Sequence, residues 1–185
     1  AGLYGDFVMQ VDWTVGQVLG AIDRAGIREN TLVMYTSDNG SFMYRKPGET
    51  GHLEDPGVQA FRPETHTANG VLRGTKADIY EAGHRVPFFA RWPGKVKAGS
   101  TCQATITHPD LFRTCAEITG ARVAKGAGPD SASFYHHLQG RPGPEREPVI
   151  HHSAGGMFSI RSGKWKMILG NGSGGRQAPK GKPFQ

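Results

Sequence analysis

Several features that would place a chain in a specialised class are absent from this sequence. Its 185 residues include only two cysteines, which excludes a disulfide-rich scaffold. No apolar run reaches the roughly 18 residues that a membrane-spanning helix needs. The first residues lack the basic start and apolar centre of a signal peptide. What remains is ordinary globular composition, with 37% hydrophobic and 21% charged residues, enough for one sizeable core.

Acidic residues are also in the minority. The chain has 16 Asp and Glu against 22 Lys and Arg, which gives a net charge of +6 and an isoelectric point near 9.5. Part of this excess lies in residues 163–185, a glycine-rich segment without any acid, whose composition is typical of a solvated tail. We therefore expect no dedicated nucleic-acid binding, while a basic cleft for an anionic substrate stays open.

The order of apolar patterns in residues 1–125 predicts an α/β core. Apolar residues recur at three- and four-residue spacing from Val8 to Ile22, which predicts an amphipathic helix that stops near Gly26. Residues 32–36 are apolar without alternation, which favours a strand covered on both faces in a parallel sheet. A second strand is expected at 86–91 and a helix at 109–119, in which Cys115 would be a small core residue. A disulfide between Cys115 and Cys102 stays open.

Residues 126–185 follow a different pattern and are predicted to form a small C-terminal antiparallel subdomain. Three short strand candidates, 148–152, 157–161 and 164–169, are separated by glycine-rich turns. We expect this small sheet to pack on the α/β core. Between the strands of the core, residues 41–69 are rich in Gly, Pro and His and have little periodicity, which is typical of a functional or disordered loop.

Two polar features stand at the ends of the core strands. Asp38 and Asn39 follow the apolar run directly, and their side chains offer two hard oxygen ligands suited to Ca²⁺ or Mg²⁺. A simple Asp-Asn-Gly turn explains the same residues. The second feature is a glycine-punctuated loop before residues 86–91, in which Lys76 is suited to bind a tetrahedral anion. For Arg73 and Arg85, we favour a solvated loop in which Glu81 pairs with an Arg.

With these residues in place, the chain resembles the C-terminal half of the sulfatases, in the alkaline-phosphatase-like superfamily. The resemblance covers roughly residues 4–169 and depends on motifs that occur in the family's order. They are DWTVG at 12–16, NTLV and TSDNG within 30–40, LRGTK at 72–76, YEAGHRVP at 80–87, ARWPG at 90–94, HPDL at 108–111 and IRSGKWK at 160–166.

The resemblance implies a fold, an activity and site residues. The fold is a partial alkaline-phosphatase-like sheet with flanking helices, and the activity is the hydrolysis of aryl or carbohydrate sulfate esters. Asp38 and Asn39 would be two protein ligands of a Ca²⁺, and Lys76 would contact the sulfate group. His151, beside His152, would approach the substrate, although cross-strand packing explains its position equally well. The resemblance also implies a periplasmic or secreted location.

One element of the family's chemistry is not found in this chain. Sulfatases use a formylglycine made from Cys or Ser in a Cys/Ser-x-Pro-x-Arg motif. Neither Cys102 nor Cys115 begins such a motif, and Ser41 is followed by Met43 where the proline is required. The resemblance therefore implies that the nucleophile and the other metal ligands lie in a missing N-terminal half. We expect the chain alone to be catalytically silent.

Two other hypotheses stay open at this point. The first is a non-catalytic sulfatase-like module that binds anionic glycans through Arg73, Lys76, His84 and the basic tail. The second is a phosphodiesterase or phosphonate monoester hydrolase, which would reuse the Asp38–Asn39 pair. The upstream sequence would separate the second from a sulfatase, because the nucleophile motifs differ.

Overall fold

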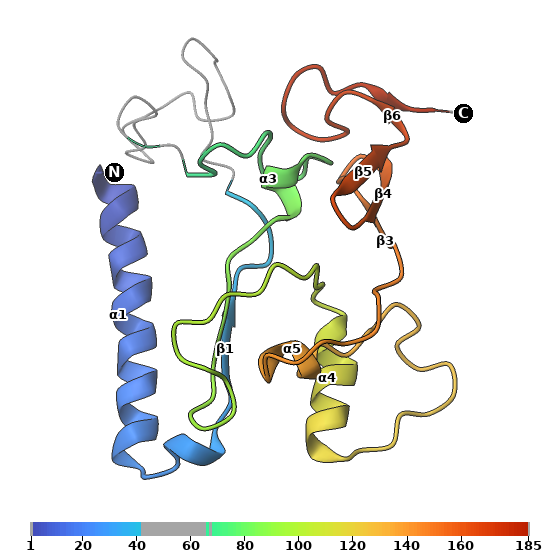
Figure 1. The fold of residues 1–185 in the computed structure, drawn as a ribbon. Coiled ribbons are helices and arrows are strands. Elements are labelled where there is room, and N and C mark those ends of the chain that lie inside the picture. The colour runs from blue at the N-terminus through green and yellow to red at the C-terminus, as the bar shows by residue number, and fades with distance from the viewer. Residues whose placement is uncertain (1, 42–65, 67, 185) are drawn as a thin grey trace.

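Helices and short antiparallel sheets make up the chain, as Figure 1 shows for this computed structural model. The structure describes residues 2–41, 66 and 68–184. Its elements are α1 (Gly2–Arg24), η1 (Arg28–Asn30), β1 (Val33–Thr36), α3 (Glu81–His84), β2 (Phe88–Arg91), α4 (Asp110–Thr119), α5 (Tyr135–Leu138), β3 (Val149–His152), β4 (Phe158–Ser162), β5 (Trp165–Ile168), β6 (Gly170–Asn171) and β7 (Lys182–Pro183). In the described part of the chain, no helix is long and apolar enough to cross a membrane.

The first strand pairs differently from our expectation. β1 and β2 form an antiparallel pair in which Val33 lies opposite Arg91 and Thr36 opposite Phe88. The prediction of a parallel sheet covered on both faces was wrong. The pairing is antiparallel, and every residue of β1 is only half-buried. A strand's direction depends on the route of the chain to its partner, which an apolar run does not reveal. The helix expected over residues 8–22 is confirmed as α1, and Asp23 near its end accepts a hydrogen bond from Arg91 on β2 at 3.0 Å.

Helix α4 is held by its polar residues. Asp110 and Thr114, one turn apart, are fully buried, and their side chains accept hydrogen bonds from the backbone of Ala132 (2.8 Å) and Phe134 (3.0 Å). Cys115 points away from this buried face and is exposed, so the expectation of a core cysteine was wrong. Both cysteines are free thiols, which closes the question of a disulfide. The hydrogen bond from Ala132 to Asp110 joins residues on the two sides of residue 125. The division of the chain into two domains at that residue stays a prediction.

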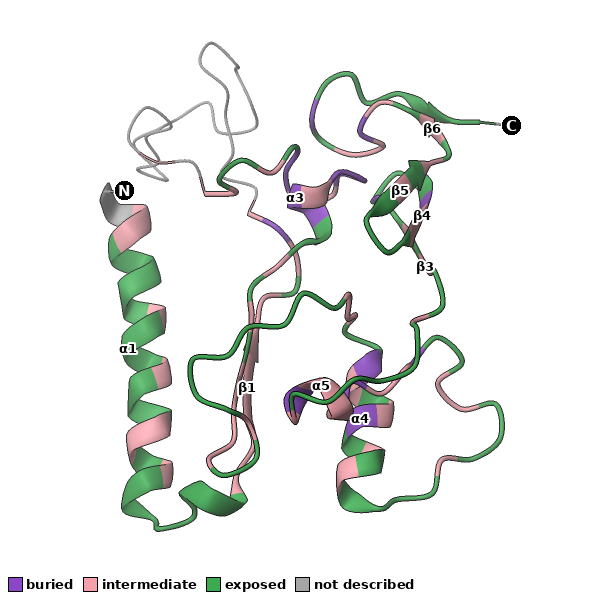
Figure 2. Cartoon of the chain, viewed as in Figure 1, coloured by how far each residue is buried: buried purple, intermediate pink, exposed green. Residues whose placement is uncertain are grey.

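The C-terminal strands build the core next to the loop that contains Lys76. β3, β4 and β5 form the expected antiparallel sheet in sequential order, and β6 pairs with β7. Ile79, Tyr80 and Met157 are buried together, with Ile168 packed against them. Figure 2 shows this burial around α3, while much of the surface of α1 is exposed.

The basic C-terminal segment is not the solvated tail that its composition suggested. Ser173 and Gln177 are buried, and Ile79 donates a backbone hydrogen bond to the Ser173 carbonyl at 2.8 Å. Glycines such as Gly175 allow the backbone of this segment to pack closely against the loop of Lys76. The high glycine content therefore serves this close packing.

Candidate active site

The turn after β1 is fixed by the residues on each side of Asn39. The Ser37 hydroxyl donates to the Asn39 carbonyl at 3.0 Å, and the Asn39 amide donates to the Gly40 carbonyl at 3.1 Å. The Gly40 backbone in turn donates to the Gly83 carbonyl at 3.2 Å. A side chain at Gly40 would overlap the Ala82 carbonyl oxygen, so glycine is required for this close approach. The turn is thereby joined to α3.

A second set of contacts joins the same turn to the loop of Lys76. The Ser41 carbonyl accepts hydrogen bonds from the Thr75 hydroxyl (2.6 Å), the Lys76 backbone (3.2 Å) and the Asn69 amide (2.9 Å). The Asn69 side-chain oxygen accepts a hydrogen bond from the Ser41 backbone at 3.0 Å. Asp38 and Asn39 are therefore held next to Lys76, although more than thirty residues separate them in sequence. The prediction that residues 41–69 form a loop falls mostly on 42–65 and 67, outside the described residues.

One pocket of about 310 Å³ collects these residues. It is lined by Asp38, Asn39, Lys76, Ala77, Gly83, His84, His152, Ser153 and Ala154. The carboxylate of Asp38 is exposed, and within the described residues neither it nor the Lys76 ammonium has a hydrogen-bond or ion-pair partner. The pocket therefore presents an acid, an amide and a free cation together.

Of the adjacent histidines His151 and His152, only His152 lines the pocket. His152 lines it, and His152 Nδ1 lies 2.8 Å from the Ser153 carbonyl. Since a carbonyl only accepts, Nδ1 donates and Nε2 is left for other partners. His151 is outside the lining: its Nε2 lies 2.9 Å from the Ser159 hydroxyl, and its ring packs edge-on to His84 at 4.4 Å. The sequence offered the His151–His152 pair without a signal for which of the two lines the pocket.

Burial and a nearby positive charge favour the uncharged forms of His84 and His151. Burial, followed by the nearby Lys166 ammonium, lowers the pKa of His84 and lowers the pKa of His151 to about 4. Burial also lowers the pKa of Lys166, although Glu81 opposes this effect. At neutral pH the His84 ring that lines the pocket and the His151 ring packed against it are therefore neutral, with a positive side chain behind them.

Glu81 links α3 to the C-terminal sheet. Its carboxylate lies 2.5 Å from Arg161 on β4 and 3.2 Å from Lys166 on β5. Burial raises the pKa of Glu81, but the hydrogen bonds and charges of Arg161 and Lys166 outweigh it and leave the pKa below its usual value. Glu81 does pair with an Arg, but its partner is Arg161 on β4 and not Arg73 or Arg85 of its own loop. Arg73 lies over the Tyr80 ring and donates to the Tyr80 hydroxyl at 2.8 Å.

The donor set fits part of a calcium site. Asp38 and Asn39 offer hard oxygen atoms, and the bond from the Asn39 amide nitrogen to Gly40 leaves the side-chain oxygen for another partner. Calcium takes about six to eight oxygens, so two residues are insufficient alone. Among the described residues, no group of three or more His, Cys, Asp or Glu is arranged to hold a metal ion.

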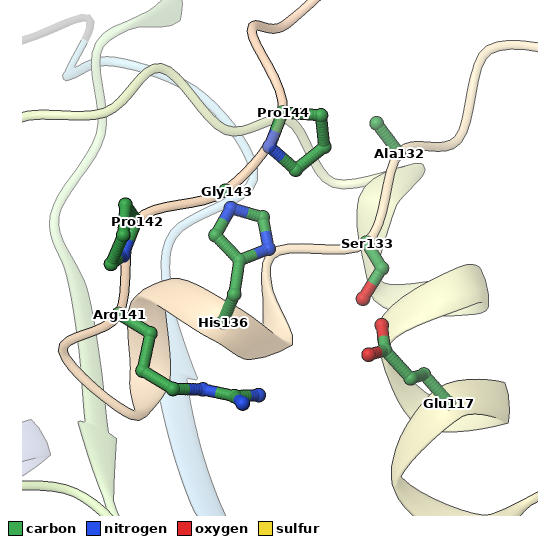
Figure 3. A pocket seen from close by; sticks show the side chains of 8 residues that line it. All are labelled: Glu117, Ala132, Ser133, His136, Arg141, Pro142, Gly143 and Pro144. Atoms are coloured by element: carbon green, nitrogen blue, oxygen red, sulfur yellow. The ribbon is translucent and has the colours of Figure 1, made fainter.

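A larger pocket, of about 680 Å³, lies between α4 and α5 (Figure 3). Glu117, Ser133, His136 and Arg141 contribute its polar groups, and it shares no residue with the pocket of Lys76. The buried His136 Nε2 has no hydrogen-bond partner among the described residues, and a Cβ added at Gly143 would overlap its ring. Acidic and basic groups are mixed here, which indicates no single ligand class.

Two residues next to Lys76 were missed by the sequence analysis. Ala77 has a φ of 80°, which is rare for a residue other than glycine. Asp78 is completely buried, and within the described part of the chain its carboxylate accepts hydrogen bonds from backbone groups alone. An ordinary-looking Ala-Asp dipeptide gives no local signal for either role.

Comparisons with known proteins agree with this arrangement. Residues 1–121 match the family model described as Sulfatase. The chain is 34% identical over 168 residues to an N-acetylgalactosamine-6-O-sulfatase of Bacteroides thetaiotaomicron, covering 90% of this chain and 31% of that protein. It is 40% identical over 123 residues to a steryl-sulfatase of Rattus norvegicus, covering 66% of this chain and 19% of that protein.

A solved structure gives the same result for the fold. It comes from work on the metabolism of multiple glycosaminoglycans by Bacteroides thetaiotaomicron, and it aligns with a TM-score of 0.75 at 34% identity. The alignment covers 90% of this chain and 33% of that chain. The chain therefore spans no more than about a third of the length of these relatives.

Proposed function

This chain belongs to the sulfatase family, and we propose that the protein containing it hydrolyses sulfate esters at the pocket lined by Asp38, Asn39 and Lys76. The main support is the juxtaposition, in one pocket, of an acid–amide pair with a lysine ammonium that has no partner among the described residues. A sulfate ester carries negative charge on oxygens, so both a hard cation and an ammonium group attract it.

The residues divide this task between them. Lys76 binds a sulfate oxygen through its ammonium group, and Asp38 and Asn39 supply two oxygen ligands to a Ca²⁺. When bound, the calcium would neutralise the charge of the sulfate and of the attacking group. The formylglycine nucleophile that the family resemblance implies lies outside these 185 residues. The chain alone is therefore proposed to be inactive.

The substrate proposed is an aryl or carbohydrate sulfate. The relatives support this range, since one is described as an N-acetylgalactosamine-6-O-sulfatase and another as a steryl-sulfatase. A periplasmic or secreted location is part of the same proposal. Fractionation of the source cells followed by immunodetection would test that location.

The proposed function is tested with the full-length protein and p-nitrophenyl sulfate. Lys76→Ala removes a charge-assisted hydrogen bond, a loss of about 1.5–3 kcal/mol, and should lower kcat/KM by about 10- to 150-fold. Asp38→Ala should weaken binding of Ca²⁺ in a calorimetric titration and abolish hydrolysis. The control is Lys97→Ala, an exposed lysine outside the pocket, which should leave the rate unchanged. Wild-type rates in the Lys76→Ala variant would contradict the proposal.

Two further measurements separate the alternatives. The isolated 185-residue chain should not hydrolyse p-nitrophenyl sulfate above its own Lys76→Ala variant. Heparin binding that is salt-sensitive, independent of Ca²⁺ and not accompanied by hydrolysis in the full-length protein would favour a glycan-binding module. Preference for bis-p-nitrophenyl phosphate would favour a phosphodiesterase.

A further inference from the structure

Asp78 is an unusual buried carboxylate beside the lysine of the pocket. Its side chain is fully shielded from solvent. One oxygen accepts a hydrogen bond from the Thr75 backbone at 2.9 Å. The other accepts from the backbones of Arg176 (2.6 Å) and Gln177 (3.1 Å). Within the described residues, no cationic side chain pairs with it, so three backbone N–H groups satisfy the carboxylate.

These three bonds connect two segments that are far apart in sequence. Thr75 immediately precedes Lys76, whereas Arg176 and Gln177 belong to the basic C-terminal segment. We propose that Asp78 is a positioning residue, which holds Lys76 at the pocket by joining the 75–78 turn to residues 173–177. This inference rests on the proposed function, because it assigns Asp78 a role through the sulfate-binding lysine.

The backbone around Lys76 supports this role independently of the Asp78 side chain. The Ala77 carbonyl accepts a hydrogen bond from the Ala154 backbone at 3.0 Å, and Ile79 donates to the Ser173 carbonyl. Ala77 itself holds a left-handed conformation, which persists only where its surroundings impose it. The turn after Lys76 is therefore fixed from two sides, by the turn that follows β3 and by the C-terminal segment.

The close packing of the C-terminal segment against Ala77 and Asp78 is a second constraint on the turn after Lys76. A side chain at Gly175 would overlap the Ala77 carbonyl and press on the Asp78 carboxylate. Gly175 thus permits the approach that the hydrogen bonds of Asp78 then stabilise. Substitutions at Gly175 and at Asp78 disturb the same contact from opposite sides, which provides two independent variants.

The conservative change Asp78→Asn isolates the role of the carboxylate. An amide of the same shape keeps one acceptor oxygen but turns an NH₂ group toward backbone donors at the other position. In the full-length protein, we expect Asp78→Asn to raise KM for p-nitrophenyl sulfate by about tenfold or more. In a Lys76→Ala background the same change should have little further effect, because the lysine through which Asp78 acts is already absent.

Asp110→Asn is the control for the loss of a buried carboxylate. Asp110 is equally buried, and its carboxylate accepts backbone hydrogen bonds from Thr107 (2.7 Å) and Ala132 (2.8 Å). It also forms an ion pair with Arg146 at 2.8 Å, whereas Asp78 forms none within the described residues, and it lies outside the pocket. It should lower the melting temperature without changing KM. An equal effect of Asp78→Asn with and without Lys76, or an equal change of KM in Asp110→Asn, would reduce Asp78 to a structural residue and overturn the inference.

A second measurement does not need activity. The rate at which acetic anhydride modifies the Lys76 amine, read by mass spectrometry against Lys97 in the same sample, reports the environment of Lys76. We expect this ratio to differ by at least twofold from the wild-type value in Asp78→Asn and in Gly175→Ala, and to stay unchanged in Asp110→Asn. Unchanged ratios in a folded Asp78→Asn or Gly175→Ala protein would refute the inference. If the wild-type enzyme hydrolyses no sulfate ester, the proposed function fails while this ratio still decides the positioning role.

Discussion

Neighbouring side chains around the pocket set one another's charge. His84 and His151 pack against each other, and the Lys166 ammonium lies behind them, hydrogen-bonded to Glu81 and to the Ile79 carbonyl at 2.5 Å. A protonated imidazole here would be poorly solvated and would face a like charge, so the neutral form is preferred. Glu81 compensates Lys166 and Arg161, which limits the positive charge of the cluster.

This arrangement predicts a pH dependence of stability. The pKa of His151 is lowered to about 4 in the fold, from an ordinary 6.5, so the unfolded chain binds the proton more readily between these values. Stability should therefore fall as the pH falls from about 6.5 to about 4, by at most about 3 kcal/mol from this residue. His151→Gln should remove most of that slope in urea unfolding measured across the range. His108→Gln, at a histidine whose partner is Thr36 instead, should keep it.

At the scale of elements, the site depends on how closely two backbone segments approach. The turn after β1 meets α3 at Gly40 and Gly83, and a hydrogen bond joins the two backbones. No side chain fits between them at Gly40. The distance between the acid–amide pair and α3 is therefore set by the absence of a Cβ.

Gly40→Ala should accordingly disrupt both the fold and the site. The added methyl group would collide with the rigid Ala82 carbonyl, and we expect a loss of about 2–4 kcal/mol in the free energy of unfolding, together with weaker Ca²⁺ binding. Gly16→Ala is the control, since Gly16 lies within α1 and a Cβ there meets nothing within 4 Å. That change should be neutral or stabilise the helix by up to about 1 kcal/mol. Equal stability of the two variants would contradict the role of Gly40.

Local elements could be predicted from the sequence far better than their pairing. The spacing of apolar residues from Val8 to Ile22 and the turns between β3, β4 and β5 are local signals, and those elements are confirmed. The antiparallel pairing of β1, the exposure of Cys115 and the burial of Ser173 depend on partners elsewhere in the chain. The local pattern suggested the wrong environment for β1 and Cys115, and composition did so for the segment of Ser173.

For the candidate site too, residues could be predicted from their type but not from distant partners. Asp38, Asn39 and Lys76 were found because their residue types suit cations and anions, and the structure brings them to one pocket. Their roles stay predictions. Asp78 could not be found, because its bonding partners lie almost a hundred residues further along the chain. An isolated aspartate carries no sign of such partners.

At the scale of the whole molecule, the thiols predict how the protein responds to redox conditions. Cys102 and Cys115 are both exposed and free. Two thiols per chain should react with Ellman's reagent without denaturant, and adding dithiothreitol should not shift the melting temperature. Cys115→Ser should change the free energy of unfolding by less than about 0.5 kcal/mol, as for other surface positions. A thiol that reacts only after unfolding would contradict this arrangement.

The pair of hydrogen bonds between Ser41 and Asn69 has a consequence for protein engineering. Each residue donates a hydrogen bond to the other, so the two ends of the intervening stretch are held together beside the pocket. The entropy of closing the intervening stretch rises only with the logarithm of its length, about 0.6 kcal/mol for each doubling. Sequences of different length can therefore be grafted between these two residues while Asp38 and Lys76 keep their places. We therefore expect this position to accept new recognition elements beside an unchanged pocket.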